Sequence, residues 1–144
     1  GRDYKVHGPT EIHYALFPHA GDWEKGMVQR ESDAWNEPLI AQFSNKLSTS
    51  VRNLIETIDS NLEISSAKIE NEALIVRLYN SSSDKKPQRI ILNGEVDGIE
   101  QIDLKGDKIA DVAYEKKANG QLSTEISIPQ FGFKTLRIKR IKPF

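Results

Sequence analysis

The side chains best suited to bind a metal ion are three evenly spaced histidines near the N-terminus, His7, His13 and His19. Imidazole is a common zinc ligand, and a structural zinc site needs four ligands. In an extended chain, which rises about 3.3 Å per residue, neighbouring histidines would lie roughly 20 Å apart. A fold-back that brings His19 and Asp22 together would supply two ligands, which do not make a zinc site. We therefore expect solvated or hydrogen-bonded polar residues here, and no metal site.

The carboxyl groups are the natural candidates for catalysis, because glycosidases use two carboxylates that lie roughly 5–9.5 Å apart. The chain has 21 acidic residues, and no pair stands out by spacing or context. It has no cysteine and no Gly-x-Ser-x-Gly elbow. Gly94, Gly98 and Gly106 fall in turns without a following helix, unlike the glycines of a phosphate-binding loop. The sequence therefore nominates no catalytic residue.

The two tryptophans, Trp23 and Trp35, are candidates for stacking against a sugar ring. On one helix, at about 100° per residue, their side chains would point roughly 120° apart. They would not form one flat platform, so burial in the core is the favoured interpretation of both.

Two other patterns could mark functional sites. Residues 133–142 contain Lys134, Arg137, Lys139, Arg140 and Lys142 interleaved with apolar residues, a pattern that could bind phosphate. Charges on a solvated strand face, or charges that protect a sheet edge, are its commoner cause. Asn80-Ser81-Ser82 is a formal glycosylation acceptor, but such triplets are frequent by chance. We favour the structural interpretation of both.

The N-terminal part, residues 1–60, reads as a strand–helix–strand lead-in. Apolar and other residues alternate over 11–17, which predicts a strand, and Asp22 stands where a helix N-cap is expected. The following amphipathic helix should pack on the rest of the protein and end before Pro38. We expect residues 39–43 to be extended and 48–60 to be a polar connection. The helical spacing of its apolar residues over 51–58 leaves a short helix as the alternative to a free linker.

The remaining residues, 61–144, are rich in predicted strands separated by turn residues. Residues 122–128 alternate strictly, which indicates a peripheral strand with one wet face, whereas residues 74–78 are apolar on both faces and indicate a central one. The expected fold is mostly β: a single domain over 1–144, an antiparallel β-sandwich of seven or more strands with one N-terminal amphipathic helix. The predicted strands cover residues 62–69, 73–80, 88–96, 99–104, 110–114, 122–128 and 133–141.

Composition limits the partners of the chain. Its 20 basic and 21 acidic residues are balanced, so no general attraction to nucleic acid or to an anionic membrane is expected. No apolar run reaches the roughly 18 residues that span a bilayer. The absence of cysteine fits a reducing compartment, and we expect a cytoplasmic protein. The oligomeric state stays open, a homo-oligomer included.

Several segments resemble one known family. Tyr14-Ala15-Leu16-Phe17-Pro18-His19-Ala20-Gly21-Asp22-Trp23 resembles the Tyr-Ala-Leu-aromatic-Pro-His-x-Gly-Asp-Trp stretch of family 38 glycoside hydrolases, the α-mannosidases. Asn36-Glu37-Pro38-Leu39 is similar to the Asn-x-Pro-Leu that closes the same helix in that family. Arg77-Leu78-Tyr79-Asn80 resembles its Arg-Leu-Tyr-Asn strand, and Lys134-Thr135-Leu136-Arg137 its closing Lys-Thr-Leu-Arg strand. The matches keep the family's order and span almost the whole chain.

The resemblance implies a place within a larger enzyme. Family 38 enzymes hold their zinc ion and carboxylate nucleophile in an N-terminal catalytic domain, and β domains end the polypeptide. This chain is similar to the last part alone, so it is expected to be non-catalytic, with no cofactor of its own. Its partners would be the remainder of the α-mannosidase polypeptide and, through the parent, an α-mannoside substrate. His19, Asp22 and Trp23, at a strand-to-helix corner, are the nearest candidates for substrate binding.

Three hypotheses stand at this point. The first is an accessory domain of an α-mannosidase, the second an independent carbohydrate-binding module, and the third a β-sandwich adhesion or interaction domain of unrelated origin. The second predicts that sugar changes tryptophan emission, because indole is the expected stacking surface.

Overall fold

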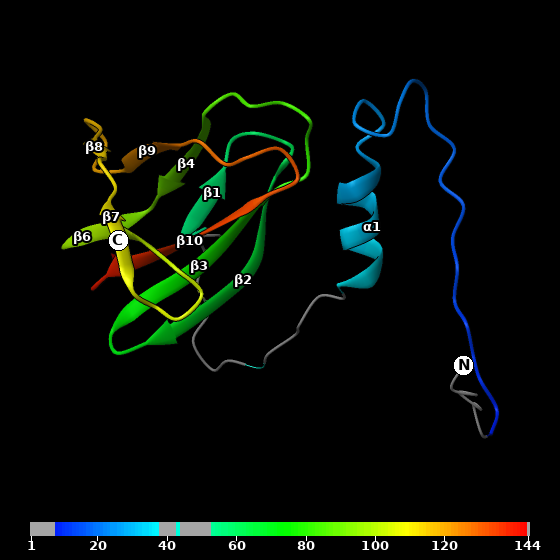
Figure 1. Cartoon of the computed structure of the whole chain (residues 1–144), viewed down its shortest axis with the longest axis horizontal. Coiled ribbons are helices and arrows are strands. Elements are labelled where there is room, and N and C mark those ends of the chain that lie inside the picture. The colour runs from blue at the N-terminus through cyan, green and yellow to red at the C-terminus, as the bar shows by residue number, and fades with distance from the viewer. Residues whose placement is uncertain (1–7, 38–42, 44–52, 144) are drawn as a thin grey trace.

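The part of the chain that the structure describes is mostly β, with antiparallel sheets and one short helix (Figure 1). The computed structural model describes residues 8–37, 43 and 53–143. The helix is α1 (Val28–Asn36). The strands are β1 (Ile55–Thr57), β2 (Leu62–Glu70), β3 (Ala73–Asn80), β4 (Gln88–Leu92), β5 (Gly94–Glu95), β6 (Gly98–Ile102), β7 (Lys108–Asp111), β8 (Glu115–Lys116), β9 (Leu122–Ile126), β10 (Phe133–Lys139) and β11 (Lys142–Pro143).

The strands form two main sheets and a short ribbon. The larger sheet has the order β2-β3-β10-β6-β7, the smaller has the order β1-β4-β9-β8, and β11 pairs with β5. All of these pairs are antiparallel. In the larger sheet β3 lies between β2 and β10, and its residue Val76 is paired with Leu136 of β10. The central position predicted for residues 74–78 is therefore confirmed.

One apolar core joins the two main sheets. Because side chains alternate along a strand, every second residue of β3 and β10 points into this core. Leu78, Leu136 and Ile138 are completely buried there, and each would cost about 2–5 kcal/mol if truncated to alanine. The cluster contains Leu62, Leu74, Val76, Leu78, Ile90, Leu92, Ile99, Leu122, Ile126, Ile128, Leu136 and Ile138.

The hairpin between β2 and β3 shapes one edge of the larger sheet. Asn71 and Glu72 both have positive φ, at 50° and 61°. Two consecutive residues in this conformation make the tight turn whose twist matches that of paired strands. Asparagine adopts it readily and glutamate does not, so Glu72 is held there by its surroundings.

The strand predicted over residues 11–17 is wrong. The segment is extended but unpaired, and it runs along the far side of α1 from the sheets (Figure 1). Ile12, Tyr14 and Leu16 are 78%, 81% and 88% exposed. Alternation specifies a strand only where a neighbouring strand supplies the backbone partners, and the described residues place none beside this segment.

The predicted helix starts later than expected and is less buried. Residues 23–27 form turns, Met27 has a left-handed φ of 52°, and α1 begins at Val28. It ends at Asn36, before Pro38, as predicted. None of its residues is buried, and Trp35 is 60% exposed, so core burial of Trp23 and Trp35 was wrong. Among the described residues, no helix is long and apolar enough to cross a membrane.

Three further predictions change in the strand-rich part. A short helix is absent from residues 53–58, the described part of the 51–58 segment, which instead contains β1, whose three residues pair with β4. The strand over 122–128 has one wet face as predicted, but β9 lies between β4 and β8 and is not peripheral. The strand predicted over 88–96 is interrupted at Asn93, and the strand predicted over 133–141 ends at Lys139. The extended segment predicted at 39–43 lies outside the described residues, except for Phe43.

Candidate functional site

The corner that contains His19, Asp22 and Trp23 is a compact turn. One carboxylate oxygen of Asp22 accepts the backbone N–H of Lys25 at 2.8 Å, and its carbonyl accepts the N–H of Gly26 at 2.9 Å. The Lys25 ammonium lies 3.6 Å from the other carboxylate oxygen. The Lys25 N–H, and then the Lys25 charge, hold the pKa of Asp22 below its usual value. Asp22 therefore caps a turn ahead of α1, and its predicted role as the N-cap of the helix is wrong, because the N-cap position of α1 is Met27.

His19 folds back over this turn. Its ring stacks on that of Phe17, with 6.1 Å between the centroids. A β-carbon placed on Gly26 would lie 2.5 Å from Nδ1 of His19, closer than two such atoms can approach. Glycine at position 26 is therefore what allows the imidazole to pack on the turn.

Trp23 and its neighbour Glu24 fasten the corner to the β structure. The indole lies 6.0 Å from the ring of Phe131, in the loop that leads into β10. The Glu24 carboxylate accepts the backbone N–H of Ser83, in the loop after β3, at 2.7 Å. The three sequence candidates thus lie in one corner, and its anchor residues Phe131 and Ser83 carried no signal in the sequence.

Asn80 connects the loop after β3 to the loop before β10. Its side chain is completely buried at the end of β3, where its amide donates to the backbone oxygens of Asp84 (3.0 Å), Ile128 (3.3 Å) and Pro129 (3.3 Å). Its side-chain oxygen accepts the N–H of Ser82 at 3.0 Å. Because the amide nitrogen is enclosed, the glycosylation triplet is inaccessible in the folded chain. The structural role of Asn80 could have been found in the sequence, because an asparagine at the end of an apolar strand, before a run of serines, is typical of a turn.

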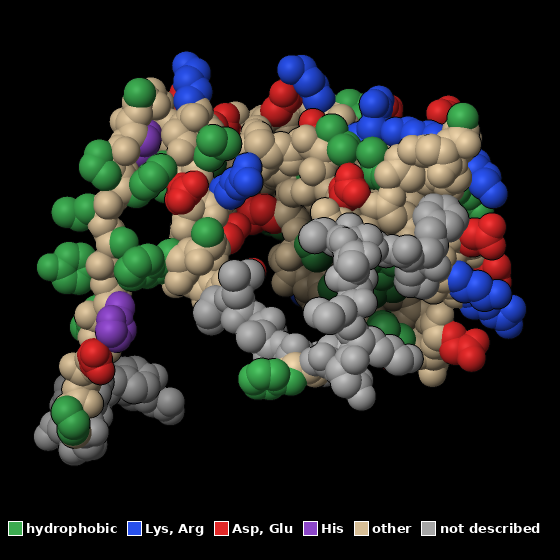
Figure 2. All heavy atoms as spheres, turned by 180° about the vertical axis from the view of Figure 1, so that it is seen from behind, with side chains coloured by type: hydrophobic (Ala, Val, Ile, Leu, Met, Phe, Trp, Pro, Cys, Tyr) green, Lys and Arg blue, Asp and Glu red, His purple; other side chains and the backbone are tan. Residues whose placement is uncertain are grey.

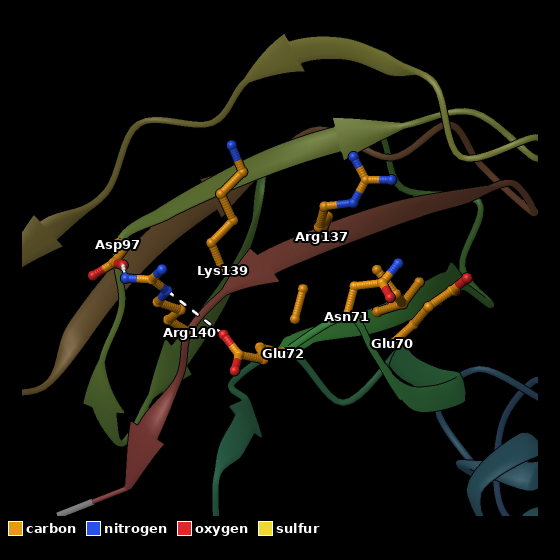
Figure 3. Close-up of a pocket in the computed structure, with 9 residues that line it drawn as sticks. Glu70, Asn71, Glu72, Asp97, Arg137, Lys139 and Arg140 are labelled. Atoms are coloured by element: carbon orange, nitrogen blue, oxygen red, sulfur yellow. Dashed lines mark ion pairs between the residues drawn. The ribbon is translucent and has the colours of Figure 1, made fainter.

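A groove of about 620 Å³ lies on the outer face of the larger sheet, beside the β2–β3 turn (Figure 3). Arg140 links two of its walls, with 3.8 Å to Glu72 and 3.5 Å to Asp97. Residues of β3 and β10 form its floor. The lining consists of Glu70, Asn71, Glu72, Ala73, Ile75, Asp97, Arg137, Lys139 and Arg140.

Glu100 pairs with two of the five basic residues of the C-terminal segment, Arg137 and Lys139. It is 6% exposed on β6, and its carboxylate lies 2.6 Å from Lys139, 3.4 Å from Lys108 and 3.5 Å from Arg137. The hydrogen bond from Lys139 is the main reason that the pKa of Glu100 lies below its usual value. Ion pairs with Glu100, and those of Arg140 with Glu72 and Asp97, therefore account for three of the five basic residues without a phosphate site.

Arg77 and Tyr79 contact the neighbouring strand and carry structural roles. The guanidinium of Arg77 lies over the ring of Phe133, with 5.4 Å to its centroid, and Tyr79 is paired with Phe133 across the strands. His13 lies 3.3 Å from Glu11, and His7 is outside the described residues. No three metal-binding side chains come together in the part of the chain that the structure describes, so its residues do not fit the zinc of the resembling family.

Comparisons of the chain with family models, with curated proteins and with solved structures give no match.

Proposed function

We propose that this chain is the non-catalytic C-terminal β domain of a family 38 α-mannosidase and that its two main sheets form a β-sandwich. In the parent, the domain would support a zinc-containing catalytic domain that hydrolyses terminal α-mannose. The shared apolar core of the two sheets supports the sandwich arrangement. A cytoplasmic location belongs to the proposal and is supported by the absence of cysteine.

The observation that carries the proposal is that the segments resembling family 38 meet in space. The strand that ends in Asn80 pairs with the strand that starts at Phe133, with Thr135 opposite Arg77. The Trp23 corner contacts Phe131, immediately before that second strand. Three of the four motifs, although far apart in the sequence, therefore lie together at one end of the larger sheet. Their proximity supports the resemblance of the whole chain to one family.

The exposed apolar residues of the N-terminal segment support a role as part of a larger assembly. In Figure 2, hydrophobic side chains gather along this segment beside α1. Ile12, Tyr14 and Leu16 are largely exposed, whereas large apolar side chains that alternate along a strand usually face a core. The remainder of the mannosidase polypeptide is the partner that the proposal assigns to them.

The reading frame that contains the chain tests this parentage. The proposal expects the translated polypeptide to include a zinc-binding glycosidase domain several hundred residues long before the residue that corresponds to Gly1. A frame that begins within a few residues of Gly1 would exclude the accessory role and leave an independent domain.

A second candidate is an independent carbohydrate-binding module, which the half-exposed aromatic pair of Trp23 and Phe131 favours. Sugar rings stack on exposed aromatic faces, and indole emission responds to such contact. Mannose titrated into a Trp35→Phe variant would report on Trp23 alone, since the chain has two tryptophans. A saturable change in emission that Phe131→Ala abolishes supports this candidate, and a flat response rules out mannose binding at this pair.

A further inference from the structure

The outer edge of β2 is the longest free strand edge that the structure describes. β2 stands at one end of the larger sheet, so among the described residues no strand pairs with its outer side (Figure 1). It has nine residues, whereas the other strands at the ends of the main sheets, β7, β1 and β8, have four, three and two. An edge strand offers unpaired N–H and C=O groups to any strand that comes alongside. β2 is therefore the strand best placed to extend a sheet beyond this chain.

The second half of this edge is the open part. A β-bulge interrupts the strand between Ile64 and Ser66. On the N-terminal side of the bulge, residues 62–65 line a groove of about 600 Å³ whose other wall includes residues of α1. Beyond the bulge, residues 66–70 are all exposed. A second strand can therefore pair with the edge from Ser66 onward without displacing the helix.

Ile69 continues the apolar core past the last strand of the sheet. Its cross-strand partner Leu74 belongs to the core, so both side chains point to the same face of the sheet. Ile69 is nevertheless 82% exposed. It stands at a groove of about 510 Å³ whose lining also includes Leu54, Leu74 and Ile141. An added strand that carries an apolar residue opposite Ile69 would take this side chain out of water.

Lys68 and Glu70 give the other face of the edge a self-complementary charge pattern. Because side chains alternate along a strand, both residues point away from the core. Their side chains are 62% and 54% exposed, and the ammonium lies 2.8 Å from the carboxylate. A lysine on an edge strand usually discourages pairing with another strand. Here the carboxylate two residues further on is the group that the lysine of a second, antiparallel copy would meet.

Charge also selects the register of such a pair. A two-fold axis perpendicular to the sheet keeps each face on its own side, so one residue lies opposite its own copy. If that residue were Lys68, two ammonium groups would face each other, which destabilises a strand pair. If it is Ile69, each Lys68 lies opposite Glu70 of the other copy, and the two isoleucines meet on the core side. The register centred on Ile69 gains two ion pairs and an apolar contact.

We propose that the edge of β2 from Ala67 to Asn71 is a dimer interface: it pairs in antiparallel register with the same edge of a second copy, with Ile69 on the two-fold axis. The two larger sheets then become one continuous sheet. The interface is short, so we expect a dissociation constant on the order of 10–100 µM. The dimer would form from this chain alone, so it goes beyond the mannosidase parentage and does not depend on it.

Charge reversal tests the interface and its register together. Sedimentation equilibrium of the chain from about 5 to about 500 µM should show a reversible monomer–dimer equilibrium. Lys68→Glu and Glu70→Lys each place like charges opposite each other, and each should weaken dimerisation about tenfold or more. The double variant, with both replacements, exchanges the two charges and should dimerise like the unchanged chain. An equimolar mixture of the two single variants should form a heterodimer, which shows that each single variant is folded.

Two matched variants separate pairing at this edge from non-specific association. Lys86→Glu reverses the charge of an exposed lysine in the loop after β3 and should leave the dimer unchanged. Ile69→Ser should weaken the dimer, whereas Ile109→Ser, at an exposed position of β7, should not. A chain that stays monomeric up to about 500 µM would overturn the proposal. So would a dimer that Lys68→Glu does not weaken, or single variants whose mixture does not associate.

Discussion

The side-chain amide of Asn80 reaches the backbone oxygen of Ile128 at 3.3 Å and thereby connects the end of β3 to the loop before β10. The two residues are 48 positions apart in the sequence, and both are buried. Since the corner at Trp23 rests on this loop and on the loop after β3, Asn80 positions the surface to which the helical segment is fastened.

Replacement of Asn80 should destabilise the whole chain. Asn80→Ala leaves the backbone oxygens of Ile128 and Pro129 and the N–H of Ser82 without this partner, and we expect a loss of about 2–4 kcal/mol in the free energy of unfolding. Urea denaturation measures it. Asn119, in an exposed turn, is the matched control, and Asn119→Ala should cost under about 1 kcal/mol. Equal costs for the two variants would contradict the role assigned to Asn80.

The packing of His19 should depend on Gly26. Gly26→Ala would push the imidazole away from the turn, because the new methyl group would overlap it. We expect faster amide hydrogen exchange over residues 19–27, measured by mass spectrometry. Gly98→Ala is the control, because a β-carbon there meets no atom within 4 Å. If both variants exchange at the rate of the unchanged chain, His19 does not depend on this glycine.

Glu100 should contribute to the pH dependence of stability. Its pKa is lowered in the folded chain, so its contribution is complete above its usual pKa of 4.5 and is lost as the pH falls through the lowered value. Glu100→Gln should therefore lower the urea midpoint at neutral pH, and this difference from the unchanged chain should shrink below about pH 4.5. A difference that stays constant down to about pH 3 would mean that the charge of Glu100 is not responsible.

Much of the β structure was predictable, and the N-terminal part was not. Residues 122–126 alternate and form a strand because β4 and β8 lie on either side, whereas residues 11–17 alternate equally well and lack a neighbour. The hydrogen bond at Asp22 spans three residues, so it has a local signal, but that signal predicts a helix start where the structure has a turn. The contact of Glu24 with Ser83 spans 59 residues, and no local pattern encodes it. The ion pairs of Glu100 likewise arise from strand order.

The apolar residues of the N-terminal segment should contribute little to the stability of the chain by itself. Ile12 and Leu16 are largely exposed, so the double variant Ile12→Ser with Leu16→Ser should change the free energy of unfolding by less than about 0.5 kcal/mol. Leu136→Ala, in the centre of the core, should cost about 2–5 kcal/mol. Urea denaturation compares them. A large loss in the double variant would show that these side chains are already buried within the chain.

Hydrolysis of an aryl α-mannoside tests the central claim most directly. The polypeptide translated from the complete reading frame and this chain alone would be assayed side by side, with and without a zinc chelator. The account predicts chelator-sensitive hydrolysis by the complete polypeptide and none by the chain alone. An inactive complete polypeptide that is folded and zinc-loaded, or hydrolysis by the chain alone that is lost when a pair of its acidic residues is replaced, would contradict it.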